Sequence, residues 1–293
     1  MEVKLRPPVP ADVDALGTLV YDAFCGLQDR HNVPRDFPAR EMAVGLMQAW
    51  TAHPKIWGVV AEAADGRVVG CNFLNERNSI AGVGPVCVDP GVQGSGIGKQ
   101  LMQAVLARAR ETGAPGVRLV QETINSTSLS LYCSLGFDVR EPLMVMRGEP
   151  GTAPAPEAGT DVRPMTADDL AGCADLCRRV HGFDRTAELR DAMGHFHPVV
   201  RTRDGRITAY SSAPTFYLLN HIVAETEQDM QRLLRGAAAL SEGQPLSLIV
   251  PTRNAALFRW CLQQRLRAVK GLTLMTLGNY QEPRGGWTPS IEY

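Results

Sequence analysis

The spacing of apolar positions over the first 148 residues predicts strands mixed with helices. Apolar residues recur at helical intervals after Pro10 and again over Ala39–Trp50, and a polar loop is expected between them at Gly26–Pro38. Short apolar runs flanked by turn residues predict strands at Glu2–Arg6, Ile56–Glu62, Arg67–Glu76, Val83–Asp89, Val117–Thr123 and Leu143–Met146. Further helices are expected up to about Thr112 and over Ser126–Ser134. This order is typical of a mixed α/β (α+β) fold, a sheet covered by helices.

The second half of the chain repeats the first weakly. Five features return in the same order: Arg6-Pro7 as Arg163-Pro164, a capped helix start at Thr166 and Asp169, Asp65-Gly66-Arg67 as Asp204-Gly205-Arg206, Asn125 as Asn254, and Leu143–Gly148 as Leu272–Gly278. Between the halves, Glu149–Asp161 is rich in proline and small residues, which is typical of an extended linker. We therefore expect two domains of one duplicated fold, at residues 1–148 and 162–293, joined by a linker at 149–161.

The strongest chemical signal is a glycine-rich loop between a strand and a helix, at Val86–Lys99. Glycines let the backbone approach a ligand closely, and the free N–H groups at a helix start favour an anion, so this loop predicts a phosphate cradle. A P-loop requires glycine where Gln93 stands, and the third glycine of a dinucleotide fingerprint would fall on Lys99. The pattern that fits is Gln-x-x-Gly-x-Gly, at Gln93, Gly96 and Gly98.

This pattern closely resembles the pyrophosphate loop of the GNAT superfamily of acyl-CoA-dependent N-acyltransferases. The resemblance continues downstream at the family spacing, with Asn125, Tyr132 and Gly136-Phe137. It implies two GNAT-like domains, each with a central, mostly antiparallel mixed sheet flanked by helices. It also implies acetyl-CoA as cosubstrate, without a metal. The residues it implies in cofactor binding are Val86, Cys87, Val88, Gln93, Gly94, Ser95, Gly96, Ile97, Gly98, Lys99 and Asn125.

The resemblance implies direct acetyl transfer to the primary amine of a small molecule. Tyr132 is the expected general acid for the leaving thiolate, because a phenol carries a proton at neutral pH. The general base is less evident, since the fourth strand lacks a carboxylate. Glu122 is the candidate, because it shares a strand face with Val120, where some family members carry glutamate. Glu76, His31 and water are the remaining options.

The corresponding stretch of the second half, His221–Leu234, has no glycine and carries acids where phosphates would bind. Cys261 stands in place of Tyr132. We therefore expect a degenerate GNAT-like domain that does not bind CoA and forms one wall of the acceptor site. The tail Pro283–Ser290 cannot be helical, and we expect it to extend across the first domain with Trp287 as an anchor.

Composition narrows the expected partners and cellular location of the protein. The net charge of −1 gives no broad basic field, so nucleic acid is not an expected partner. Apolar runs are too short to span a membrane. The seven cysteines are scattered without a CxxC pair, which indicates a reducing, cytoplasmic location. The chain is expected to be a monomer or homodimer. The alternatives to a small-molecule enzyme are a protein lysine or N-terminal acetyltransferase and a non-enzymatic acyl-CoA-binding module.

Overall fold

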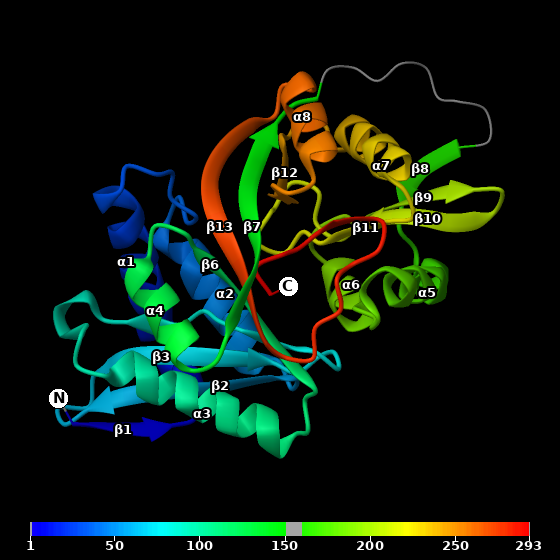
Figure 1. The fold of residues 1–293 in the computed structure, drawn as a ribbon. Coiled ribbons are helices and arrows are strands. Elements are labelled where there is room, and N and C mark those ends of the chain that lie inside the picture. The colour runs from blue at the N-terminus through cyan, green and yellow to red at the C-terminus, as the bar shows by residue number, and fades with distance from the viewer. Residues whose placement is uncertain (1, 151–159, 293) are drawn as a thin grey trace. The chain divides into compact units, whose positions relative to one another are not determined.

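The computed structural model describes residues 2–150 and 160–292, which form two compact units (Figure 1). The first unit comprises the chain up to Arg118 together with Ile124–Leu135. The second comprises Leu119–Thr123 and the chain from Gly136 onward.

A small sheet with helices on both faces makes up the first unit. Its strands are β1 (Val3–Arg6), β2 (Ile56–Ala63), β3 (Val68–Asn75), β4 (Ala81–Val83), β5 (Cys87–Val88) and the start of β6 (Gly116–Glu122). Its helices are α1 (Val13–Arg30), α2 (Arg40–Ala52), α3 (Ile97–Glu111) and α4 (Ser126–Ser134), with single 3-10 turns η1 (Pro10–Asp12) and η2 (Pro90–Val92). Strands β1 to β4 are antiparallel, β5 also pairs with β3, and β6 begins parallel to β4.

The two faces of this sheet carry different helices (Figure 1). A Cβ added at Gly70 on β3 would lie 2.9 Å from Leu101 of α3, whereas the neighbouring Phe73 packs edge-on against Trp50 of α2. Because side chains alternate along a strand, even positions of β3 face α3 and odd positions face α1 and α2. The register between β3 and β5 extends this rule: Val88, opposite Gly70, faces α3, and Cys87 faces α1.

Two elements of the first unit differ from the sequence-based expectation. Helix α1 runs to Arg30, through the start of the expected Gly26–Pro38 loop, because Gln28 is fully buried and continues the inward face. The apolar run Val83–Asp89 is two short strands rather than one. Gly84, at a φ of +132°, and Pro85, which has no N–H to donate, interrupt the ladder between β4 and β5.

The second unit contains two groups of strands. Its strands are β7 (Asp138–Gly148), β8 (Thr160–Pro164), β9 (Val199–Arg203), β10 (Arg206–Ser211), β11 (Ile222–Ala224), β12 (Leu246–Pro251), β13 (Arg267–Gly278) and β14 (Gly286–Thr288). Its helices are α5 (Leu170–His181), α6 (Thr186–Ala192), α7 (Glu227–Leu240) and α8 (Ala255–Gln263), with one 3-10 turn, η3 (Ala167–Asp169). An antiparallel sheet has the order β14-β11-β10-β9-β8, and β7 pairs antiparallel with both β12 and β13.

Strand β7 has its sheet neighbours in the second half of the chain. The sequence places this strand at the end of the first domain, yet both of its partners, β12 and β13, belong to the second unit. The last 11 residues of the expected 1–148 range therefore pack with the second unit. Of the expected linker Glu149–Asp161, residues 151–159 lie outside the described residues, and β8 already begins at Thr160.

The predicted repeat between the halves is confirmed at the level of side-chain contacts. In the first unit, the Arg6 guanidinium donates two hydrogen bonds to Asp12, whose carboxylate also accepts the N–H three residues before it. In the second, Arg163 contacts Asp169 in the same way across the same spacing, and Asp169 completes the expected capping box with Thr166. The same set of side-chain contacts occurs at corresponding positions in both halves, which indicates duplication.

Later elements of the repeat also correspond. Asn125 caps α4 by accepting the Ser128 N–H at 3.1 Å, and Asn254 caps α8 by accepting the Leu257 N–H at the same distance. Arg265 adopts a left-handed φ of +67° at the turn where the first half has Gly136. The turn is thus retained although the glycine that makes it easy is lost.

The C-terminal tail is a strand of the second unit's own sheet, so the expectation that it crosses the first domain is wrong. Residues Gly286–Thr288 form β14 and pair with β11. Trp287 is buried in the core of this unit, against His181, rather than on the first domain. Ser290 accepts a hydrogen bond from the buried Arg185. Burial of the tryptophan, rather than proline content alone, determines where the tail lies.

Trp287→Ala is expected to lower the free energy of unfolding by about 3–5 kcal/mol, because it removes a large buried side chain and leaves a cavity. Urea denaturation followed by circular dichroism measures this change. Leu240→Ala, at a side chain that is 43% exposed, is the matched control and should stay within about 1 kcal/mol of the wild type. A loss below 1 kcal/mol for Trp287→Ala would contradict the anchoring role.

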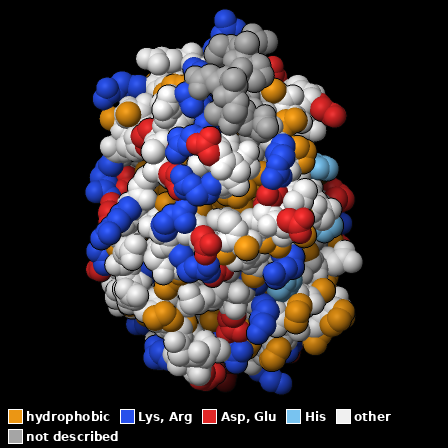
Figure 2. All heavy atoms as spheres, turned by 90° about the vertical axis from the view of Figure 1, so that its right-hand side faces the viewer, with side chains coloured by type: hydrophobic (Ala, Val, Ile, Leu, Met, Phe, Trp, Pro, Cys, Tyr) orange, Lys and Arg blue, Asp and Glu red, His pale blue; other side chains and the backbone are white. Residues whose placement is uncertain are grey.

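On the face that Figure 2 shows, basic, acidic and hydrophobic side chains are interspersed. No helix in the described part of the chain combines the length and apolarity needed to cross a bilayer. Within residues 2–150 and 160–292, no three His, Cys, Asp or Glu side chains are placed to hold a metal ion.

Candidate active site

A cavity of about 540 Å³ opens in the first unit, within the range of about 300–1,000 Å³ typical of small-molecule sites. Four segments line it: the second half of α1, β5 with the residue before it, the glycine loop with the start of α3, and the segment from Ile124 into α4. The structure thus brings together most of the residues that the sequence singled out. Those that line the cavity are Val86, Cys87, Val88, Gln93, Gly94, Gly96, Ile97, Gly98, Lys99, Asn125 and Tyr132.

The glycine loop presents open backbone at the start of α3. Gly94 and Gly96 have φ values of +81° and +86°, and a Cβ added at either would meet no atom within 4 Å. Gly96 is the N-cap of α3 and makes no side-chain capping bond, so the first N–H groups of this helix face the cavity uncapped. Together with Lys99 and the helix dipole, they form a site with the electrostatics for an anion.

Two predicted cofactor-binding side chains support the loop itself. The Gln93 amide donates to the Val88 carbonyl at 3.1 Å, and the Ser95 hydroxyl donates to the Val92 carbonyl at 2.6 Å. Asp89 accepts the Gly91 N–H at 2.8 Å. Ser95 does not line the cavity. These bonds hold the loop in the conformation that leaves its backbone N–H groups available.

Tyr132 enters the cavity from α4 and is buried, with 6% of its side chain exposed. Burial raises the pKa of Tyr132 to about 12, partly offset by a hydrogen bond with Ser128, and the nearby Cys87 raises it further. The pKa of the Cys87 thiol is also raised, first by its hydrogen bond with Cys71 and then by burial. Both groups therefore stay protonated at neutral pH. Tyr132 can donate a hydrogen bond or a proton, and Cys87 is not a thiolate nucleophile.

The charges that line the cavity are positive. Arg30 comes from the end of α1 and Lys99 comes from α3, while no aspartate or glutamate is among the described residues of the lining. His31, directly after Arg30, also lines the cavity. Of the stripe from Ala23 to His31, the sequence singled out His31 alone, as an optional base in a loop, because the polar letters after Gly26 were interpreted as a loop. The only available signal was the helical spacing of Ala23, Leu27 and Arg30.

Neither carboxylate considered as a base lines this cavity. Glu122 is buried, and its Oε1 lies 2.6 Å from the Nζ of Lys270. Glu76 accepts two hydrogen bonds from Arg108, at 2.7 and 3.0 Å. Each carboxylate is thus already engaged by a cation. The proposed mechanism therefore involves neither Glu122 nor Glu76.

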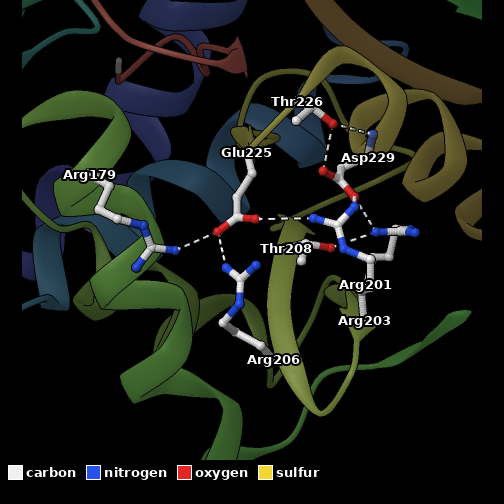
Figure 3. A network of polar contacts seen from close by, with 8 residues as sticks. All are labelled: Arg179, Arg201, Arg203, Arg206, Thr208, Glu225, Thr226 and Asp229. Atoms are coloured by element: carbon white, nitrogen blue, oxygen red, sulfur yellow. Dashed lines mark hydrogen bonds and ion pairs between the residues drawn. The ribbon is translucent and has the colours of Figure 1, made fainter. Parts of the chain in front are cut away.

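The corresponding helix start in the second unit is occupied by its own side chains (Figure 3). Thr226 caps α7 by accepting the Asp229 N–H at 3.1 Å, and the buried Asp229 carboxylate contacts Arg201 and Arg203. Glu225, one residue before the cap, contacts Arg179 and Arg206. Carboxylates therefore fill the position at which the first unit leaves backbone N–H groups open.

Two family models match the chain. The acetyltransferase (GNAT) family model matches residues 26–137, and an acetyltransferase (GNAT) domain model matches residues 173–286. Together they cover most of the chain, so the protein belongs to the GNAT acetyltransferases, in a tandem form with two GNAT domains. The predicted family and fold class are confirmed.

Known proteins agree with this assignment. A mycothiol acetyltransferase of Nocardia farcinica is 31% identical over 113 residues, a match that spans 37% of each chain and thus little more than a third of that relative. The structure of a Pyrococcus horikoshii protein assigned as an acetyltransferase superposes with a TM-score of 0.76 at 18% identity, covering 99% of this chain and 94% of that one. A tandem GNAT protein from the clavulanic acid pathway gives 0.59 at 14% identity, covering 94% and 98%. The two structural likenesses show the fold.

Proposed function

We propose that this protein is an acetyl-CoA-dependent N-acetyltransferase that transfers the acetyl group directly to the primary amine of a small molecule. The observation that carries the proposal is one cavity that joins the uncapped start of α3 to a buried, protonated tyrosine. The Nocardia farcinica relative is named a mycothiol acetyltransferase, after a small molecule, which supports a small-molecule acceptor here.

Acetyl-CoA suits the residues present. It carries several phosphate charges, and the cavity offers open N–H groups at Gly94–Lys99, the Lys99 ammonium and no carboxylate. Val86, Cys87 and Val88 line the cavity, and their backbone groups are the proposed partners of the pantetheine arm. Asn125, which caps α4, and Ile97 and Gly98 complete the wall. These assignments are the ones the sequence predicts, and the cavity lining supports them.

Transfer requires a bond to form between the amine nitrogen and the thioester carbonyl carbon, and the carbon–sulfur bond to break. The Tyr132 hydroxyl donates its hydrogen to the departing sulfur. Its raised pKa makes it a reliable hydrogen-bond donor to the developing thiolate rather than a strong acid.

The second unit supplies no counterpart, because Cys261 occupies the equivalent place and Thr226 and Asp229 cap α7. We therefore propose one cofactor site per chain.

A screen of small primary amines, with detection of the free thiol of CoA, tests the proposal. The expected result is amine-dependent thiol release with at least one acceptor and no release with its N-acetylated form. Release only with lysine-bearing peptides would favour a protein acetyltransferase. Acetyl-CoA binding without release to any amine or peptide would favour a binding module.

A further inference from the structure

The proposed reaction leaves one proton without an acceptor. Amines are mostly protonated at neutral pH, and the nitrogen attacks only after it loses that proton. The ionisable side chains that line the cavity are Arg30, His31, Cys87, Lys99 and Tyr132. Arginine and lysine are already cations, and Tyr132 and Cys87 hold their protons because their pKa values are raised. The imidazole of His31 is the remaining ionisable group among the described residues of the lining, and imidazole is a side chain that serves as a general base in enzymes.

His31 lies at the end of the α1 stripe. Residues 23, 24, 27, 30 and 31 fall on one side of a helix, and all five line the cavity. The stripe begins with the apolar Ala23 and Phe24 and ends with Arg30 and His31. Helix α1 packs against β3 and β5, on the face toward which Cys87 points. Val88 points to the other face, toward α3, where the anion site lies. The stripe therefore lines the cavity from the face opposite the phosphate cradle, the side left for an acceptor.

The chain after α1 holds His31 in place. Its N–H bonds to the carbonyls of Leu27 and Gln28, and Asn32 then turns the chain with a φ of +52°. The buried Gln28 side chain donates to the Asp36 carboxylate at 2.7 Å and accepts the Asp36 N–H at 3.0 Å. These bonds tie the loop back onto α1 without engaging the imidazole. Within the described residues, no hydrogen bond or ion pair occupies the side chain of His31.

We infer that His31 is the general base of the proposed acetyl transfer, an inference that rests on the transferase assignment above. The His31 imidazole takes one proton from the substrate ammonium. The freed amine forms the carbon–nitrogen bond as the carbon–sulfur bond breaks, and the Tyr132 hydrogen passes to sulfur. The second nitrogen proton restores the Tyr132 hydroxyl, and the His31 proton goes to solvent. The products are the amide, CoA as a thiol and one proton.

The charged groups around the imidazole define what its pH dependence reports. Arg30 from α1, Lys99 from α3, Cys87 from β5 and Tyr132 from α4 share the cavity with it. Next to it in the chain, Asp29 is paired with Arg35 through two hydrogen bonds, so this carboxylate is neutralised. The pKa values of Cys87 and Tyr132 are raised and the pKa of Asp29 is lowered, so these three groups keep their charge state near neutral pH. An acid limb of activity that the wild type shows and His31→Gln lacks therefore belongs to the imidazole.

His31→Gln tests the inference, with acetyl-CoA and an amine acceptor from the screen. The expected result is a fall in kcat/KM of about 100-fold or more at pH 7, loss of the acid limb, and an acetyl-CoA Kd within twofold of the wild type. Imidazole added to the buffer should restore part of the rate. With hydroxylamine, which is largely unprotonated at neutral pH, variant and wild type should react at similar rates, a result that a structural defect would not produce.

His195→Gln, at an exposed histidine of the second unit, is the control and should keep the wild-type rate and pH profile. A His31→Gln variant that keeps the acid limb and loses less than threefold in kcat/KM would overturn the base assignment and leave the transferase intact. A wild type that binds no acetyl-CoA, or releases no thiol with any amine, would contradict the transferase and this inference together.

Discussion

Gly96→Glu is expected to weaken acetyl-CoA binding by about 100-fold or more, which corresponds to about 2.8 kcal/mol. Gly96 is the N-cap of α3 and lines the cavity, and a Cβ there meets no protein atom within 4 Å. The new carboxylate therefore has room to enter the anion site. There it would satisfy the helix N–H groups, cancel their partial positive charge and repel the phosphates. Isothermal titration calorimetry measures the change.

Gly113→Glu is the matched control for this substitution. Gly113 follows the other end of α3 with a φ of +70°, and its Cβ also meets no atom within 4 Å, so the backbone strain is comparable at about 1–2 kcal/mol. It does not line the cavity. This control should lose similar thermal stability but keep the wild-type Kd. Equal affinity in Gly96→Glu and wild type would place the cofactor elsewhere.

The same titration tests the second unit. One saturable site per chain is expected, because Thr226 and Asp229 already satisfy the start of α7. Two sites per chain, with one surviving in Gly96→Glu, would show that the second unit binds the cofactor despite its capped helix.

Tyr132→Phe is expected to lower kcat by about 100-fold to 10,000-fold, the range typical of a lost general acid, while the acetyl-CoA Kd changes less than threefold. The substitution keeps the ring that fills the α4 side of the cavity and removes only the hydroxyl. Steady-state kinetics with thiol detection measures kcat. Tyr280→Phe, at a partly exposed tyrosine of the second unit whose hydroxyl contacts Glu282, is the control and should leave kcat unchanged.

The pH dependence of the same pair adds a second readout. An acid must be protonated, so its contribution is lost as pH rises through its pKa in the folded protein. The pKa of Tyr132 is about 12 rather than 10. Between pH 8 and about 10.5, wild-type kcat should therefore show no decline that depends on the Tyr132 hydroxyl. The pH profiles of the wild type and of Tyr132→Phe should have the same shape over this range. A Tyr132-dependent decline centred near pH 10 would indicate that the phenol is solvated rather than buried.

The anion cradle could be predicted because its parts are contiguous in sequence. Gln93 lies in the loop, Gly96 is the N-cap of α3, and Gly98 lies in the first turn of that helix. Their spacing alone therefore specifies which N–H groups are exposed. The N-caps at Asn125 and Asn254 are local for the same reason, each reaching three residues ahead. The ordered repeat of such local signals was enough to indicate a duplicated fold.

Other features depend on partners far along the chain. Glu122 is engaged by Lys270, 148 residues away, so the sequence could not show that its carboxylate is already paired. The apolar alternation of Leu143–Met146 predicts a strand but does not determine its neighbours, and β7 joined β12 and β13. The C-terminal strand β14 pairs with β11 of its own unit, and the sequence likewise does not determine this neighbour.

The sequence by itself determined the family, the duplication and the cofactor loop, because helix starts, caps and glycine turns follow from interactions within a few residues. Only the tertiary structure decided which ionisable groups share the cavity. It extended α1 to Arg30, where the buried Gln28 bonds with Asp36, and it paired Glu122 with Lys270. Because burial and ion pairing act across long sequence separations, only the folded chain shows that His31 lines the cavity and that Glu122 does not.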